Sequence, residues 1–347
     1  MRADRYYPGF RAGKRTLQWY PDDFVSAGLP LETGRIWYVD GDKSTGGAGA
    51  KWEDAFSESD FTGSLSGISS SIAAGDVILV AGRTMAQTDT DPISYTTNLT
   101  IDIPQVSIIG VSRGRTQGGL PQFKVGATTT QAVIRVRAPG VLIANIGING
   151  SGATGGGIRF DDDGGTTYAS FGGTVVGCHF KNCVGTTSNN AATGGAIQLS
   201  GAPWQMLFTG NRFYKNVGDI VLLDTSNAVS QDVVIQDNIF SGPAANVDCN
   251  LYLAGGSGIN GVVIDSNIFQ QLPALGGTND RFIDATGCTG MLTRNMFGAL
   301  VSEGSSEKTF EAAGTGAKIP TTMHMAGNYG QFETGVGSGL ISGEIFA

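Results

Sequence analysis

V-V-I-Q-D-N-I-F at residues 233–240 and V-V-I-D-S-N-I-F at 262–269 are two copies of one phrase. In each copy, apolar residues are followed by two variable positions, an asparagine, one further residue and phenylalanine. Related copies read M-L-F-T-G-N-R-F (206–213), M-L-T-R-N-M-F (291–297) and, in decayed form, M-H-M-A-G-N-Y (323–329). A weaker copy, T-V-V-G-C-H-F (174–180), has cysteine in place of the asparagine. The chain therefore contains an internal repeat.

The asparagines of these copies recur at intervals that suit stacked repeats. Successive ones are 27, 29, 28 and 33 positions apart: Asn211, Asn238, Asn267, Asn295 and Asn328. The apolar runs are short, rich in Val, Ile and Phe, and bounded by Gly, Asn and Ser, which indicates strands rather than helices. Each interval also holds a second strand phrase: A-I-Q-L-S (196–200), I-V-L-L-D (220–224), L-Y-L-A (251–254), F-I-D-A (282–285) and F-E-A-A (310–313). Two or more strands per repeat predict a parallel solenoid.

Stacking gives the repeated residues structural tasks. Coils stacked at ~4.8 Å place equivalent residues in columns along the axis. We expect the phenylalanines to form an internal aromatic column of Phe180, Phe213, Phe240, Phe269 and Phe297. We expect the asparagines at the bend, because Asn tolerates the left-handed backbone conformation and its amide can bond the neighbouring coils. The bend ladder would then contain Asn211, Asn238, Asn267 and Asn295.

These features resemble those of the right-handed parallel β-helix, or pectin-lyase-like, superfamily. Besides the repeat, I-W-Y-V-D-G-D (36–42), W-E-D-A-F (52–56) and A-A-G-D-V-I-L-V-A-G (73–82) are similar to that family's opening strand and capping helix. The resemblance implies an all-β fold, a right-handed parallel β-helix solenoid with an irregular N-terminal arm and a short capping helix. The same solenoid serves lyases, glycoside hydrolases, epimerases, adhesins and viral tailspikes, so it does not assign a function.

The composition suits one elongated domain with flanking segments. Of 347 residues, 54 are glycine, 40% are apolar and only 15% are charged. We predict an N-terminal anchoring arm (1–35), a parallel β-helix (36–330) and a C-terminal tail (331–347). No apolar run approaches the roughly 18 residues of a membrane helix, and the opening M-R-A-D-R-Y-Y-P lacks a signal peptide's apolar stretch. We therefore expect synthesis in a cytoplasm, without export by that route and without membrane insertion.

The predicted arm differs from the body in charge. Residues 1–15 have a net charge of +4. Because the whole chain has a net charge of −8, residues 16–347 have a net charge of −12, which argues against nucleic acid binding along the body. The arm combines arginines with aromatic residues, a mixture typical of protein interfaces. Its candidate anchoring residues are Arg2, Arg5, Tyr6, Tyr7, Phe10, Arg11, Arg15, Trp19 and Tyr20. A cap folded over the first coil, a docking arm, and an arm for nucleic acid or membrane surfaces all remain open.

Carbohydrate-cleaving members of the family that this chain resembles carry acidic residues on the outer face of adjacent coils, so the resemblance implies that a catalytic site would lie there. Aligning the second strand phrases on Ile197, Val221, Leu251 with Leu253, Ile283 and Phe310 gives an outward column of Gln198, Leu222, Tyr252, Asp284 and Glu311. Asp284 and Glu311 would lie one coil apart, near the ~5 Å carboxyl separation of a retaining glycosidase. They are the candidate catalytic residues, although a register error of one residue would exchange inside and outside. Arg281 and Arg294 lie nearby as possible bases, but arginine is more often an ion-pair partner.

The sequence favours neither a metal site nor a cofactor. Cys178, Cys183, Cys249 and Cys288 have irregular spacing, which predicts buried free thiols. C-H-F-K-N-C (178–183) offers three ligands without a fourth. The D-D-D-G-G run (161–165) could bind calcium, but an exposed turn is favoured. No phosphate loop or dinucleotide fingerprint occurs.

Two functions of different class follow from these observations. The first is a structural virion protein, a β-helix capsid decoration or short spike anchored by its arm to capsid or tail proteins of a phage. Self-association, with a homotrimer as the expected form, would protect the solenoid ends. The alternative is a polysaccharide lyase or glycoside hydrolase of the same fold. A non-catalytic adhesin for a host-surface glycan is a third possibility, and the structural function is preferred.

Overall fold

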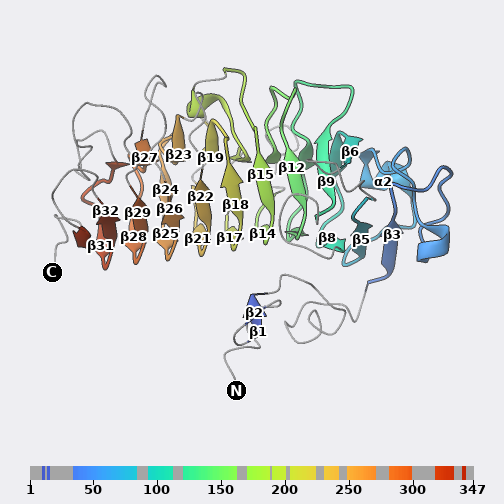
Figure 1. Cartoon of the computed structure of the whole chain (residues 1–347), viewed down its shortest axis with the longest axis horizontal. Helices are drawn as coiled ribbons and strands as arrows, with labels where there is room; N and C mark the ends of the chain where they lie inside the picture. The colour runs from blue at the N-terminus through green and yellow to red at the C-terminus, as the bar shows by residue number, and fades with distance from the viewer. Residues whose placement is uncertain are drawn as a thin grey trace.

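The computed structural model describes residues 10–11, 14–15, 34–83, 93–111, 120–161, 170–187, 190–200, 204–223, 230–241, 248–270, 281–298, 317–331 and 338–340. Within these ranges the chain forms an all-β parallel solenoid, which confirms the predicted fold class. Figure 1 shows the coils stacked side by side from β3 to β31.

Three long sheets run along the described part of the solenoid, and each is named here by its place in a coil. Sheet I contains β3 (Ile36–Val39), β5 (Val77–Ala81), β8 (Ser107–Val111), β11 (Leu142–Ala144), β14 (Thr174–Val176), β17 (Leu207–Thr209), β21 (Val234–Gln236), β25 (Val262–Asp265), β28 (Gly290–Thr293) and β31 (Met323–Ala326). Its pairs are all parallel, and Figure 1 shows it along the lower side of the molecule.

Sheets II and III complete each coil. Sheet II contains β6 (Ser94–Thr97), β9 (Gln122–Val125), β12 (Gly147–Asn149), β15 (His179–Lys181), β18 (Arg212–Tyr214), β22 (Ile239–Ser241), β26 (Ile268–Phe269), β29 (Met296–Gly298), β32 (Tyr329–Gln331) and β33 (Ser338–Leu340). Sheet III contains β4 (Gly63–Ser64), β7 (Leu99–Ile101), β10 (Ile134–Val136), β13 (Ile158–Phe160), β16 (Ile197–Leu199), β19 (Gly218–Leu222), β23 (Cys249–Tyr252), β27 (Arg281–Asp284) and β30 (Ala317–Lys318). β33 pairs antiparallel with β32.

The remaining described elements are short. They are β1 (Phe10–Arg11), β2 (Lys14–Arg15), β20 (Ser230–Gln231), β24 (Ile259–Asn260), the 3-10 turns η2 (Trp52–Asp54) and η3 (Ala191–Thr193), and the helix α2 (Leu65–Ile68). β1 and β2 form an antiparallel pair. α2 lies at the N-terminal end of the solenoid, where a capping helix was predicted, and buries Leu65. No helix among the described residues is long and apolar enough to span a membrane.

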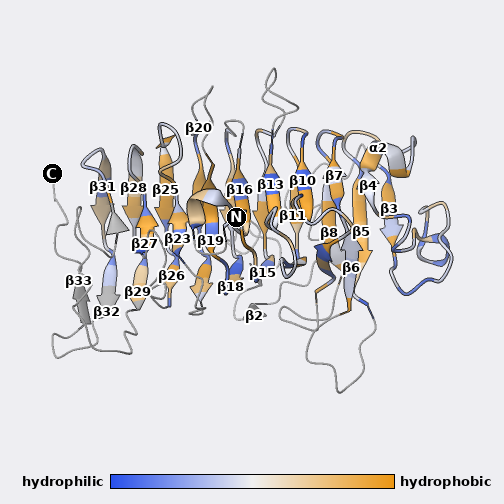
Figure 2. Cartoon of the chain, turned by 90° about the horizontal axis from the view of Figure 1, so that it is seen from above, coloured by the Kyte–Doolittle hydropathy of each residue, from blue (hydrophilic) through white to orange (hydrophobic). Residues whose placement is uncertain are grey.

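The repeat phrase corresponds to one strand of sheet I, a two-residue turn and one strand of sheet II. In V-V-I-Q-D-N-I-F, for example, β21 and β22 flank the turn residues Asp237 and Asn238. Because the strands of successive coils pair in step, alternate side chains point into the solenoid and form columns. Figure 2 shows the apolar character of these strands.

The interior contains the aromatic column of the repeat. Phe180, Phe213, Phe240, Phe269 and Phe297 are at most 3% exposed. Neighbouring rings stack with centroids 4.7 to 5.0 Å apart and interplanar angles of 8 to 19°. Each ring is thus shielded by the ring of the adjacent coil, so the apolar surface of one coil is buried only when the next coil is present.

Candidate functional site

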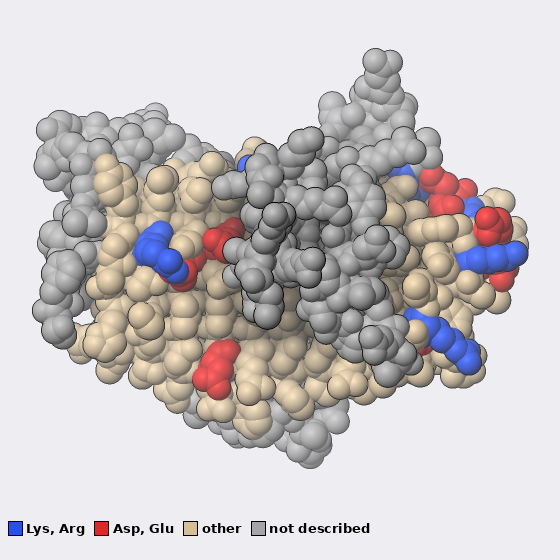
Figure 3. Space-filling view, turned by 90° about the horizontal axis from the view of Figure 1, so that it is seen from below, with Lys and Arg blue, Asp and Glu red and all other residues tan. Residues whose placement is uncertain are grey.

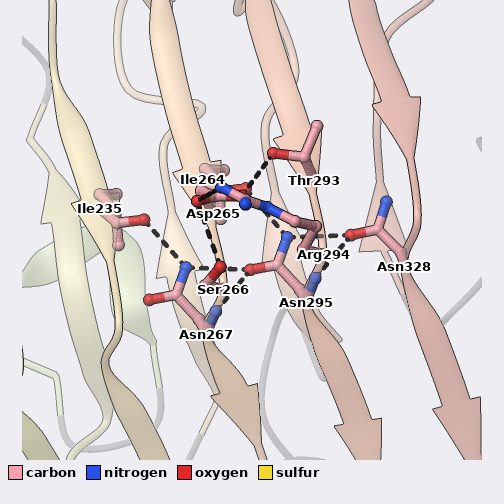
Figure 4. Close-up of polar contacts among 9 residues, drawn as sticks. All are labelled: Ile235, Ile264, Asp265, Ser266, Asn267, Thr293, Arg294, Asn295 and Asn328. Carbon is pink, nitrogen blue, oxygen red and sulfur yellow. Dashed lines mark hydrogen bonds and ion pairs between the residues drawn. The ribbon is translucent and has the colours of Figure 1, made fainter. Parts of the chain in front are cut away.

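The turn between sheets I and II carries a continuous hydrogen-bonded ladder of buried asparagines (Figure 4). Asn267 Oδ1 accepts hydrogen bonds from Asn238 N and Asn238 Nδ2, both at 3.0 Å. Asn267 Nδ2 donates to Asn295 Oδ1 at 3.0 Å and to Ile235 O at 2.9 Å. The same pattern joins Asn211 to Asn238 and Asn295 to Asn328. Every amide in this series is occupied by the neighbouring coils, which leaves it no free group for catalysis.

The left-handed residue of each turn is the one before the ladder asparagine, so the expectation that asparagine itself takes this conformation is wrong. Positive φ angles occur at Asp237, Ser266 and Arg294, each 55°, and Gly210 and Gly327 take the same place in their coils. The left-handed residue turns its side chain outward, while the asparagine that follows turns inward. An asparagine is selected at the inner position for its two-sided hydrogen bonding, not for its backbone preference.

Asp265 and Arg294 form an ion pair on the outer side of this turn (Figure 4). Arg294 Nε donates to Asp265 Oδ1 at 2.9 Å, and Arg294 Nη2 contacts Asp265 Oδ2. Thr293 Oγ1 donates to Asp265 Oδ1 at 2.7 Å. Burial alone would raise the pKa of Asp265, but the hydrogen bonds from Arg294 and Thr293 lower it below its usual value. This carboxylate is held ionised and is a poor proton donor.

Asp284, a candidate catalytic residue, is buried and has partners on both oxygens. Its Oδ2 lies 2.9 Å from Arg281 Nη1, and its Oδ1 accepts from Thr286 Oγ1 at 2.6 Å. The side chain is 4% exposed. Burial, and then the charge of Asp284, raise the pKa of the adjacent Tyr252. The geometry is that of a clamp that joins β27 to the turn after it.

The strand register places a different residue next to Asp284 than the sequence alignment suggested. β27 pairs with β30, so that Ile283 lies beside Ala317 and Asp284 beside Lys318. The F-E-A-A phrase at 310–313, and with it Glu311, lies outside the described residues. In the described part of sheet III the neighbour of Asp284 in the next coil is therefore a lysine.

The alignment of the second strand phrases, which placed Val221 beside Ile197, is wrong by one residue at β19. Ile197 pairs with Ile220 and Gln198 with Val221, so Val221 belongs to the outer face and Leu222 to the interior. Val221 is buried nevertheless, because it packs with Ala191 of η3 and with Cys249. The apolar run I-V-L-L shows no alternation, since both of its faces are covered, and this is why the sequence misplaced it.

Three arginines that were not predicted as site residues lie around Asp161 at the outer face of sheet III. Arg135 and Arg159 are paired positions of β10 and β13, and Arg137 follows β10. Arg135 Nε donates to Asp161 Oδ2, while Arg137 Nε and Arg159 Nε lie 4.0 and 3.9 Å from the same oxygen. Because these partners occupy Asp161, it is not free for the calcium loop considered above, whose Asp162 and Asp163 lie outside the described ranges. The R-V-R and R-F-D spacing within strands was a signal that could have revealed the cluster.

A second buried polar cluster lies where sheet II turns into sheet III. Asp219 accepts from Asn216 Nδ2 at 2.9 Å and from Asn250 Nδ2 at 2.7 Å. Burial raises the pKa of Asp219 to about 7, and the two amide hydrogen bonds only partly offset it. Asn216 also accepts from Cys183 N, in the same manner as a ladder asparagine. The three side chains are buried, with exposed fractions of 1 to 5%.

The four cysteines are free and buried. Cys178 and Cys183 belong to the core, whereas His179 lies in the outward column with Arg212, so these three side chains do not converge on a metal. Burial raises the pKa of the Cys178 thiol to about 12. No group of three or more metal-binding side chains occurs among the described residues.

The candidate anchoring residues cannot be placed in the same way. Of these residues, the structure describes only the backbone pairing of Phe10 with Arg15 and of Arg11 with Lys14. The others lie outside the described ranges: Arg2, Arg5, Tyr6, Tyr7, Trp19 and Tyr20.

Comparison of the chain with protein-family models, with curated proteins and with solved structures found no match. The fold assignment therefore rests on the stacked sheets themselves.

Proposed function

We propose that this chain is a structural virion protein, a β-helix capsid decoration or short spike that residues 1–35 anchor to a larger assembly. One observation carries the structural part of this proposal: three carboxylates on the described outer faces, the candidate Asp284 among them, are used to hold the fold. Asp161, Asp265 and Asp284 on the described outer faces each pair with arginine. A general acid must hold and release a proton near neutral pH, and the hydrogen bonds from Arg294 keep the pKa of Asp265 below its usual value.

The ladders support a passive, rigid role. Asn211 to Asn328 form one uninterrupted hydrogen-bonded series, and the phenylalanine rings stack beside it. A body braced in this way suits a protein that presents a surface at a fixed distance from its attachment point. The mixture of arginine and aromatic residues in residues 1–20 supports attachment through the N-terminal segment. Capsid or tail proteins are the proposed partners, and a homotrimer is the proposed form.

The assembly proposal is tested by the mass in solution of the full chain and of a variant lacking residues 1–35. Multi-angle light scattering should show a defined oligomer for the full chain, with a trimer expected. The shortened chain should keep its β-rich circular dichroism spectrum and lose binding to virus particles from which the protein has been stripped. Equal particle binding by both proteins would contradict an anchoring role for the N-terminal segment. A monomeric full chain would contradict the trimer.

A further inference from the structure

Positive groups outnumber negative ones in the arginine cluster of sheet III, which consists of Arg135, Arg137 and Arg159 around Asp161. All three guanidinium groups have a nitrogen within 4.0 Å of Asp161 Oδ2. The Asp161 side chain is only 5% exposed, whereas the arginine side chains are 31 to 38% exposed. The carboxylate thus lies beneath the arginines, and the cationic groups form the surface.

The cluster has more hydrogen-bond donors than acceptors. A guanidinium group has five N–H donors and no acceptor. Arg137 Nε and Arg159 Nε are buried without a hydrogen-bond partner, and Arg159 Nη2 donates to Ser200 Oγ at 3.2 Å. An unsatisfied buried donor is unfavourable, so an additional acceptor at this place would be stabilising.

The described neighbours of the cluster do not supply that acceptor. In the outward column, Thr100 and Gln198 flank the paired Arg135 and Arg159, and neither is charged. Asp102, which follows β7, accepts hydrogen bonds from the backbone N and Oγ of Ser66. Gln198 Nε2 donates to Gly155 O and Gly195 O. With Asp102 and Asp161 both counted, these described positions still hold three positive groups against two negative ones, so an excess of positive charge remains on the outer face.

We propose that Arg135, Arg137 and Arg159 bind an oxyanion group, a carboxylate or a sulfate ester, of an acidic glycan. The planar guanidinium fork matches both groups in geometry, and arginines on adjacent coils can hold one anion from two sides. The arginine side chains are 31 to 38% exposed, so a ligand group can reach them from outside the sheet. Nucleic acid has a denser negative charge, and residues 16–347, with a net charge of −12, would repel it. The inference depends on these arginines alone and holds whether or not the chain belongs to a virion.

The test is calorimetric titration of the full chain with sodium sulfate, polygalacturonate and dextran sulfate at fixed ionic strength. Arg137→Gln and Arg159→Gln should each weaken binding by about tenfold, because each removes a charge-assisted hydrogen bond. Arg159→Lys should weaken it less, since the charge is kept and the fork is lost. Arg212→Gln is the matched control: it removes the same charge from the outer face of sheet II and should change the affinity less than about twofold.

Each result decides the proposal. Binding of polygalacturonate identifies a carboxylate ligand, and binding of dextran sulfate identifies a sulfate ligand; either supports the inference if the cluster variants lose it. Equal loss in Arg212→Gln would show general charge attraction and would overturn it. So would absence of binding by the wild-type chain, or tighter, cluster-dependent binding of a DNA oligonucleotide. Thermal melting of every variant separates a binding defect from unfolding.

Discussion

The two ends of sheet I differ in what they place on the outer face. From β5 to β14 one outward column is apolar; it consists of Leu79, Ile109, Ala144 and Val176, and Ile109 and Ala144 are only 1 and 0% exposed. Farther along the same column the residues become Thr209, Gln236, Asp265 and Thr293. Figure 3 views this side from below, and its visible described surface carries few charged groups. Along this column the N-terminal coils thus pack apolar side chains together on the outer face, whereas the C-terminal coils place polar side chains there.

The turns between sheets I and II also differ in length between the N-terminal and the C-terminal coils. From β11 onward two residues connect the sheets, whereas the connections after β5 and β8 span residues 82–93 and 112–121. A ladder needs equivalent side chains at stacked positions, which only a turn of constant length supplies. The C-terminal coils are therefore held by hydrogen bonds at a repeated turn, and the N-terminal coils by apolar contacts on two faces.

The largest effect is expected inside the ladder, for Asn267→Ala. The substitution removes the acceptor of Asn238 N and Nδ2 and the donor to Ile235 O, all of them buried. At about 1–3 kcal/mol for each unsatisfied group, the free energy of unfolding should fall by roughly 3–5 kcal/mol, measured by urea denaturation. Asn260→Ala, at an exposed position, is the control and should cost less than about 0.5 kcal/mol. Equal costs at both sites would show that the ladder contributes nothing.

The outer face is tested by Leu142→Asp and Val234→Asp. These residues occupy one outward column of sheet I, but Leu142 is buried and Val234 is partly exposed. Introducing a charge at the shielded position should cost about 3 kcal/mol, against less than about 1 kcal/mol at the second. Similar melting temperatures for the two variants would contradict the difference between the two ends of the sheet.

Asp219, in β19, should make the free energy of unfolding depend on pH. Its pKa in the folded protein is about 7, against about 4 in an unfolded chain. Between these values the folded state holds a proton that the unfolded state releases, so stability falls as pH rises from about 4 to 7 and is fully retained only below that window. The slope should be at most about 1.4 kcal/mol per pH unit. Asp219→Asn should flatten the curve of unfolding free energy against pH, and an unchanged slope would assign it to other groups.

The smallest effect is expected at the start of the ladder, for Cys178→Asn. Asn211 Oδ1 already accepts from Cys178 N, so an amide at 178 can continue the series by one coil. The gain should be about 1 kcal/mol or less, because a core thiol is lost at the same time. Cys178→Ala, which removes the thiol without adding an amide, should be destabilising. If both variants lose the same stability, then the ladder does not extend into the N-terminal coils.

The repeat phrase allowed much of the fold to be predicted, because asparagine, phenylalanine and the strand alternation recur together in it. The phenylalanine column and the position of each bend followed from that phrase alone. Prediction failed where alternation was absent or the connection was long. Val221 lies in an apolar run covered on both faces, and the strand beside Asp284 begins at Ala317, seven residues after the first residue of the phrase that was aligned with it.

The candidate site was less predictable, because its parts come from different coils. Ion pairs such as Arg281 with Asp284 were visible in the sequence as neighbours, but their burial was not. Asp161 and Arg135 lie 26 residues apart, and only the register of β10 and β13 brings them together. The pairing of each carboxylate with arginine is a tertiary property that residue type cannot reveal.

The most direct test of the account is whether the outer face of sheet III cleaves a glycan. The wild-type chain and Asp284→Asn would be incubated with a panel of acidic polysaccharides, and reducing ends and unsaturated uronates would be measured. A structural protein should release neither, and the variant should differ from the wild type only in its melting temperature. Release of either product by the wild type, abolished in Asp284→Asn while the fold is retained, would contradict the account and make Asp284 a catalytic residue.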